Sequence, residues 1–134
     1  MKNVIGSVLV ATSLLTGFTS TKAYAMEPSE YFRLRIEAIS LTLEGLRSQI
    51  ACLKRNDCRT DELISMAERT QVKIYELYQN AGTTPARAAL YYTRHRSELD
   101  PLFEDGEFAD ELKKLQREIE AADAELSSLK KDPS

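Results

Sequence analysis

The chain has 134 residues and a formal net charge of -3, from 18 Lys and Arg against 21 Asp and Glu. A mildly acidic protein of this size is a poor candidate for nucleic-acid binding. It contains only one His and two Cys, which leaves few ligands for a metal centre. The composition therefore excludes more functions than it suggests.

Residues 1–25 have the order of a secretory signal peptide. Lys2 precedes an apolar run from Val4 to Phe18, and the small-residue pattern Ala23-Tyr24-Ala25 offers a cleavage site. The run is about 15 residues long, whereas a membrane-spanning helix needs roughly 20, which disfavours an uncleaved anchor. We therefore expect a protein exported to the periplasm or the cell exterior, with a single mature domain over residues 26–134 and no membrane anchor.

Cys52 and Cys58 are the only cysteines and lie six positions apart. An even number of cysteines in an oxidising compartment is typical of a disulfide. A redox motif usually has two residues between its cysteines where this chain has five, and a metal site would need further ligands. The sequence predicts a Cys52–Cys58 disulfide, for which the turn residues Asn56 and Asp57 supply the break in the helix.

An amphipathic pattern over residues 28–54 predicts a long first helix. Leu34 and Leu41 form an apolar strip away from the main seam, so this helix is expected to contact more than one neighbour. Gly45 costs roughly 1 kcal/mol against Ala inside a helix, which indicates either close helix packing or simple tolerance. The main seam steps by four and three residues, as in a coiled coil, through Phe32, Ile36, Ile39, Leu43, Leu46, Ile50 and Leu53.

Three further helices are expected. The second runs from about residue 61 to Gly82, which can adopt the left-handed conformation of a helix C-terminus. Thr84 and Pro85 start a short third helix, over about 85–99, that is interrupted at Asp100-Pro101. The fourth begins between residues 101 and 106, and its narrow seam comprises Phe108, Leu112, Leu115, Ile119, Ala122, Leu126 and Leu129.

The fold class that follows is all α, because no segment shows the alternation of a strand. Short connections favour antiparallel neighbours, which gives a small antiparallel helical bundle of three long helices plus one short helix that forms an elbow. The disulfide closes the first hairpin. The coiled-coil-like seams either pack on one another within one chain or pair with another copy or a partner helix.

The sequence lacks the patterns of common catalytic centres. There is no His-Glu-x-x-His motif, no Gly-x-Ser-x-Gly elbow, no phosphate-binding glycine loop and no set of histidines for a di-iron site. We therefore predict no enzymatic activity and no catalytic, cofactor-binding or metal-binding residues. A small hydrolase, the contrasting hypothesis, would require two or more carboxylates that converge in a cleft.

Residues 98–111 form an acidic run of seven carboxylates without a Lys, Arg or His. An EF-hand loop with Gly106 at its sixth position fails, because its first, third and twelfth positions would be Pro101, Phe103 and Leu112. The run is interpreted as a solvated turn that favours the start of the last helix. An acidic docking surface is the other interpretation.

The short helix carries residues of types that are frequent at the centres of protein interfaces. In one interpretation the rings fill the elbow and the arginines pair with the acidic run. In the other, which we adopt as the prediction, this segment is a partner-binding surface. Its members are Tyr91, Tyr92, Arg94, His95 and Arg96.

Together these observations predict an exported, non-enzymatic helical protein-binding module of the cell envelope. It would act as an accessory, adaptor, chaperone-like or inhibitor/immunity component. Its partner is expected to be another envelope or exported protein, or a second copy, and no cofactor is expected. The alternative is a structural protein that self-assembles through its coiled-coil seams.

Overall fold

The computed structural model describes residues 26–131, all of whose regular structure is helical. The predicted signal peptide lies outside the described residues, whereas the predicted all-α class is confirmed. There are five helices in the described range, and two of them are short where one short helix was expected. They are α3 (Pro28–Leu53), α4 (Thr60–Asn80), α5 (Pro85–Arg94), α6 (Arg96–Asp105) and α7 (Ala109–Lys131).

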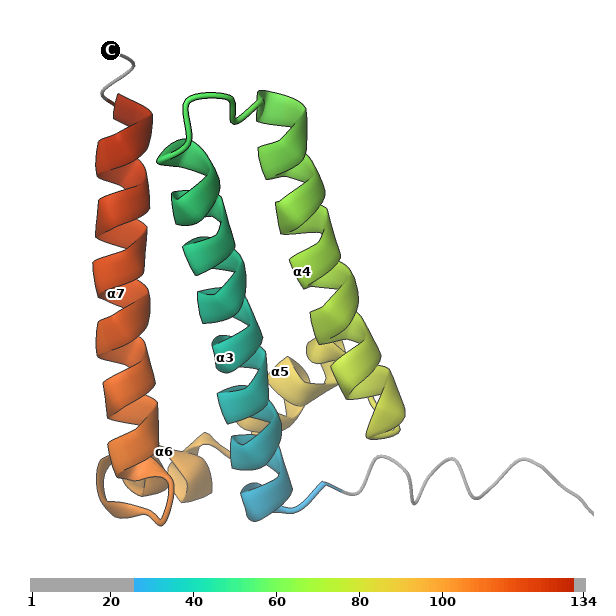
Figure 1. The fold of residues 1–134 in the computed structure, drawn as a ribbon. Coiled ribbons are helices and arrows are strands. Elements are labelled where there is room, and N and C mark those ends of the chain that lie inside the picture. Colours follow the sequence, from blue (N-terminus) through green and yellow to red (C-terminus); the bar gives the residue numbers. More distant parts are fainter. Residues whose placement is uncertain (1–25, 132–134) are drawn as a thin grey trace, which may run out of the picture.

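The three long helices form one layer with α3 in the middle, and α5 and α6 cross its base (Figure 1). α3 packs against α7 on one side and against α4 on the other, while α4 and α7 share no substantial interface. The arrangement is therefore an open layer around a central helix rather than a closed three-helix bundle.

The directions of the long helices differ in part from the expectation. Arg47 pairs with Glu118 at 3.8 Å, and seven residues further along both helices Lys54 pairs with Glu125 at 2.8 Å. α3 and α7 therefore run parallel, and the prediction of an antiparallel bundle is wrong for this pair. The reason is that α5 and α6 carry the chain back across the base before α7 begins. Only α3 and α4 are antiparallel neighbours.

α3 can occupy the middle because it has apolar residues on two opposite faces. Leu34 and Leu43 are both buried, and nine residues of helix place them about two and a half turns apart, on opposite sides. The seam that includes Leu43 faces α7, since a hollow between the two helices is lined by Leu43 and Leu115. The strip of Leu34 and Leu41 lies on the side of Gly45, which faces α4. The expectation of more than one neighbour for this helix is confirmed.

Gly45 marks the closest approach of α3 and α4. A Cβ added to Gly45 would collide with Oγ1 of Thr70 and would lie 3.3 Å from both Cβ and Cγ2 of the same residue. The Thr70 hydroxyl donates a hydrogen bond to the Met66 carbonyl at 3.1 Å, which holds the side chain in this position. Close packing, and not simple tolerance, therefore explains a glycine in the middle of a 26-residue helix.

We expect Gly45→Ala to destabilise the protein despite the better helix propensity of Ala. Overpacking costs about 1 to 3 kcal/mol, and the gain in propensity is about 1 kcal/mol, so the net loss is about 1 kcal/mol. In a Thr70→Ala background the obstruction is gone, and Gly45→Ala should become neutral or stabilising. Urea denaturation of the four members of this double-mutant cycle measures the coupling. Strict additivity of the two substitutions would contradict the packing explanation.

The break between the two short helices occurs at His95 and not at Asp100-Pro101, where it was expected. His95 has φ -121° and ψ 26°, and its Nδ1 lies 2.9 Å from the Tyr91 carbonyl oxygen. Its own carbonyl accepts hydrogen bonds from the backbone N–H groups of Glu98 and Leu99, so it also begins α6. Pro101 lies inside α6. Its side chain is exposed to solvent.

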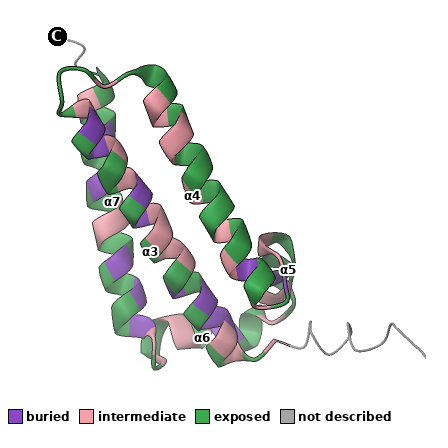
Figure 2. Ribbon diagram, turned by 45° about the vertical axis from the view of Figure 1, so that its right-hand side comes forward, coloured by how far each residue is buried: buried purple, intermediate pink, exposed green. Residues whose placement is uncertain are grey.

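The core lies at the base of the layer and between α3 and α7. Buried residues follow α3 and α7 along their lengths, whereas most of α4 is exposed or intermediate (Figure 2). Tyr78 is the only buried residue that α4 contributes. α7 buries its seam against α3. The buried residues of both predicted seams therefore pack within the chain.

The Cys52–Cys58 disulfide is present and joins the end of α3 to the turn before α4, with Cα atoms 5.2 Å apart. Arg55 in the same turn pairs with Glu62 at 3.3 Å, and the Glu62 carboxylate accepts the Arg59 backbone N–H at 3.0 Å. The predicted closure of the first hairpin is confirmed. Separately, none of the helices in residues 26–131 is long and apolar enough to cross a membrane.

Candidate functional site

Aromatic side chains cluster where the N-terminal turn of α3 meets the two short helices. The Tyr31 ring lies 5.8 Å from Tyr91 and 6.0 Å from Tyr92, measured between ring centroids. Phe32 makes an edge contact with Phe103 at 4.9 Å. Such pairs stabilise beyond the area that they bury. The cluster therefore fixes the position of α5 and α6 under α3.

Tyr92 is the centre of a polar network in this cluster. Its hydroxyl donates a hydrogen bond to Oδ1 of Asp100 at 2.6 Å. The other carboxylate oxygen of Asp100 lies 3.6 Å from Nε of Arg96, and the Arg96 guanidinium also stands 5.7 Å from the centre of the Tyr92 ring. These three side chains bridge α5 and α6 across the break at His95.

The other predicted partner-binding residues have different environments. The Tyr91 ring stacks on the His95 ring at 4.3 Å, and both are half-buried. Arg94 is exposed and forms no ion pair or hydrogen bond with another described residue. Of the five predicted residues, Tyr91, Tyr92 and His95 therefore pack within the elbow. Arg96 is exposed but paired with Asp100, and Arg94 is exposed without a partner among the described residues.

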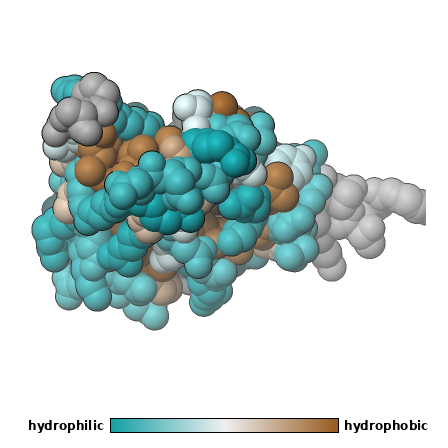
Figure 3. All heavy atoms as spheres, turned by 45° about the horizontal axis from the view of Figure 1, so that its top comes forward, coloured by the Kyte–Doolittle hydropathy of each residue, from teal (hydrophilic) through white to brown (hydrophobic). Residues whose placement is uncertain are grey.

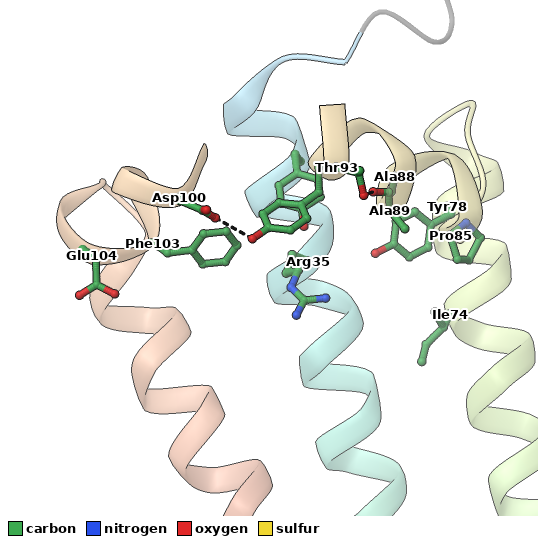
Figure 4. A pocket seen from close by; sticks show the side chains of 12 residues that line it. Arg35, Ile74, Tyr78, Pro85, Ala88, Ala89, Thr93, Asp100, Phe103 and Glu104 are labelled. Carbon is green, nitrogen blue, oxygen red and sulfur yellow. Dashed lines mark hydrogen bonds between the residues drawn. The ribbon is translucent and has the colours of Figure 1, made fainter. Parts of the chain in front are cut away.

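A pocket of about 760 Å³ opens beside this network, between α3, α4, α5 and α6. Figure 4 shows Arg35 reaching from α3 into the space between Asp100 and Phe103 on one side and Tyr78 and Pro85 on the other. We call this space the elbow pocket. Its lining residues are Tyr31, Arg35, Ile74, Tyr78, Pro85, Ala88, Ala89, Tyr92, Thr93, Asp100, Phe103 and Glu104.

The charges that line the elbow pocket differ in their partners. Asp100 is held by Tyr92 and Arg96, and Oε1 of Glu104 lies 3.9 Å from Nζ of Lys113 outside the pocket. Arg35, by contrast, makes no ion pair or hydrogen bond with any residue in the described range. The pocket therefore presents one uncompensated charge, which is positive.

Three tyrosine hydroxyls of the pocket are held in their neutral form. Burial raises the pKa of Tyr31 and of Tyr78, and the nearby positive charge of Arg35 partly opposes this rise in pKa. The pKa of Tyr92 is raised chiefly because its hydroxyl donates to the Asp100 carboxylate. The Tyr31 and Tyr78 hydroxyls therefore remain O–H donors near the Arg35 guanidinium, whereas the proton of the Tyr92 hydroxyl is already donated to Asp100.

These shifts predict alkaline destabilisation. A tyrosine whose pKa is higher in the folded state favours folding at pH values below its unfolded pKa of about 10. This contribution is lost as the pH rises through the folded pKa. We expect the urea midpoint to fall from about pH 10 upward, together with the appearance of tyrosinate absorbance. Tyr92→Phe should make the fall shallower, and identical alkaline profiles for this variant and the parent would contradict the assignment.

Sequence reasoning missed the part of the pocket that α3 and α4 contribute. Arg35 lies next to a strip of apolar residues and resembles any solvated helix charge in the sequence. Its place in a pocket depends on the position of α5 and α6 under α3, which local sequence patterns do not encode. The one available signal was the accumulation of tyrosines near the elbow, of which Tyr78 lies in the pocket wall and Tyr75 is exposed.

The remaining candidate sites offer less chemistry. Within the described residues, one group brings three potential metal-ligand atoms within 4.8 Å of one another, namely those of Cys52, Cys58 and Glu62. Both sulfur atoms belong to the disulfide, so only one carboxylate is left.

The end of the layer seen in Figure 3 is largely hydrophilic, with hydrophobic residues in separate small patches.

Comparison of the chain with models of known protein families, with curated proteins and with solved structures finds no match. The function is therefore inferred from the physical chemistry of the elbow and its pocket.

Proposed function

We propose that this protein is an exported, non-enzymatic helical module that binds another protein of the cell envelope through α4 and the elbow. In this role it is an accessory component of an envelope process, such as an adaptor, a chaperone-like protein or an inhibitor. The signal-like segment over residues 1–25 supports export, and the absence of the catalytic motifs named above supports a binding role.

One observation carries the proposal. Among the described residues, the large hydrophobic side chains that are about half exposed all lie on two helices, α4 and α5. Single exposed apolar residues are normal on protein surfaces, but their restriction to two of the four helices that line the elbow pocket is informative. They are Ile64 at 54%, Val72 at 55%, Tyr75 at 48% and Leu90 at 46% exposure.

Arg94 adds a free cation to this surface, one turn along α5 from Leu90. Tyr and Arg are the residue types most enriched in interface hot spots. Replacement of Tyr91, Arg94 and Arg96 together would not test this surface cleanly, because Tyr91 stacks on His95 and Arg96 pairs with Asp100. Leu90 and Arg94 are exposed, so their replacement leaves the fold intact.

The test is site-specific photocrosslinking in the native host. A photoreactive residue at position 75, 90 or 94 should yield one discrete adduct, and the same residue at the exposed positions 114 and 120 of α7 should not. The adduct identifies the partner by mass spectrometry. Binding of the purified partner should then be lost with a Leu90→Ser and Arg94→Glu double variant and kept with Lys114→Glu.

Three outcomes overturn the proposal. Equal adducts from both sets of positions would mean that no specific surface exists. Retention of purified-partner binding in the double variant would remove α5 from the interface. N-terminal sequencing of the exported protein is expected to begin at Met26, and an uncleaved chain found only inside the cell would refute the envelope location.

A further inference from the structure

The elbow pocket contains a cation that the protein itself does not neutralise. Arg35 comes from the central helix, is exposed, and has no hydrogen-bonding or ion-pair partner in the described part of the chain. An arginine presents a planar fork of donors that matches a carboxylate in a two-point interaction. An occupant of this pocket would therefore gain most from an anionic group near Arg35.

Two acidic residues also line the pocket, but each already has a positive or hydrogen-bonding partner. Asp100 accepts the Tyr92 hydroxyl and pairs with Arg96. Glu104 pairs with Lys113. Only Arg35 remains uncompensated, so the pocket is complementary to a single negative charge and not to a cation.

The wall opposite Asp100 is apolar. Pro85 and Ala88 form it together with the ring of Tyr78, and Ile74 lies below them (Figure 4). Of this wall, Pro85 and the neighbouring Ala89 reach the surface, whereas Tyr78 and Ala88 are buried. An occupant with an apolar side chain directly beside its negative charge fits this combination of an arginine and an apolar wall.

The acidic run argues against a partner segment with many carboxylates. Seven acidic residues lie between Glu98 and Glu111, and Asp100 and Glu104 belong to the pocket itself. Like charges in such proximity repel an acid-rich peptide. A lone carboxylate avoids this repulsion.

We infer that the elbow pocket binds the free C-terminal carboxylate of a partner polypeptide whose last side chain is apolar. In a C-terminal residue the carboxylate and the side chain leave the same Cα atom, which places charge and apolar group side by side, as the pocket requires. Arg35 binds the carboxylate, and the last side chain packs against the part of the wall that Pro85 and Ala89 expose. The inference rests on the proposed protein-binding function and names the chemistry that is recognised.

The experiment uses a matched pair of probes that differ only in charge. N-acetyl-L-phenylalanine carries the carboxylate and the apolar side chain, whereas N-acetyl-L-phenylalanine amide is neutral. Titration of the purified protein is followed by amide chemical shifts in nuclear magnetic resonance. The acid should bind at about millimolar concentration, as expected for a ligand of this size, and shift the resonances of Ala88, Ala89 and Phe103. The amide should bind at least about tenfold more weakly.

Two exposed arginines of the same helix provide the variants. Arg35→Gln should weaken binding of the acid by about tenfold or more, and Arg33→Gln, outside the pocket lining, should leave it unchanged. Equal affinity for acid and amide would overturn the inference. So would full binding by Arg35→Gln, or no binding of either probe at about 20 mM.

The same variants separate this inference from the proposed function. If the crosslinked partner binds Arg35→Gln as tightly as the parent, the module binds a protein but the pocket does not read its C-terminus. If the acid binds in an Arg35-dependent way and no specific adduct forms in cells, the carboxylate site stands and the protein-binding function fails. An amidated C-terminal peptide of the identified partner, compared with the free acid, then completes the distinction.

Discussion

Leu99→Ala is expected to lower the free energy of unfolding by about 2 to 5 kcal/mol. Leu99 is the most completely buried residue of the core, at 0% exposure, and lies in α6 next to Asp100. Truncation removes the apolar contacts of its side chain and leaves a cavity that a short helix can fill only by moving. The expected result is a lower urea midpoint.

Leu90→Ala is a matched control from the neighbouring short helix. Leu90 is 46% exposed, so the same chemical change should alter stability by no more than about 0.5 kcal/mol. Equal losses for the two variants would show that α6 does not pack as described. A chemical-shift comparison of Leu99→Ala should also show changes at Tyr92 and Asp100, because α6 positions one half of that hydrogen bond.

Reduction of the disulfide is expected to cost about 2 to 2.5 kcal/mol, from the loop entropy that a short crosslink removes from the unfolded chain. In a domain of about 100 residues this corresponds to a decrease in the melting temperature of about 10 °C. Helix content should persist, because the ion pair between Glu44 and Lys73 and the close contact between Gly45 and Thr70 still hold α4 on α3. Thermal unfolding followed by circular dichroism, with and without reductant, measures both quantities.

The control for this prediction is a Cys52→Ala and Cys58→Ala double variant, whose stability should not respond to reductant. Alanine suits position 52 because Cys52 is buried at 2% exposure, where a serine hydroxyl would need a new partner. A parent protein whose melting temperature is unchanged on reduction would mean that the disulfide contributes nothing to the stability of the hairpin.

Local features of the fold could be predicted from the sequence because they depend on periodicity and on turn chemistry. The seam through Leu43 and the strip through Leu34 each identify a buried face of α3, and the two cysteines identify the first hairpin. Features that depend on distant contacts could not. The parallel direction of α7 follows from the path of α5 and α6, which short-range patterns do not encode.

The candidate site shows the same division. The tyrosines of the elbow were visible as a cluster, but the sequence could not distinguish Tyr92, which holds Asp100, from a residue free for a partner. Nothing in the sequence marked Arg35 as a site residue, since its proposed role depends on the pairing of Asp100 and Glu104 with other residues. The position of the break between the two short helices was also predicted wrongly, at Asp100-Pro101 and not at His95. The sequence signal for the break was the proline, whereas the structure has the break at His95, whose Nδ1 lies 2.9 Å from the Tyr91 carbonyl oxygen.

The open layer has a consequence for motion. α4 is joined to the rest of the chain by the disulfide at one end and the elbow at the other, and it contacts only one long helix between them. Amides of α4 should therefore exchange with solvent through a local opening that leaves α3 and α7 paired. Since α4 also forms one wall of the elbow pocket, a bound ligand should slow that exchange, and reduction of the disulfide should speed it. The disulfide near one end of α4 would thus set how readily the pocket at the other end widens.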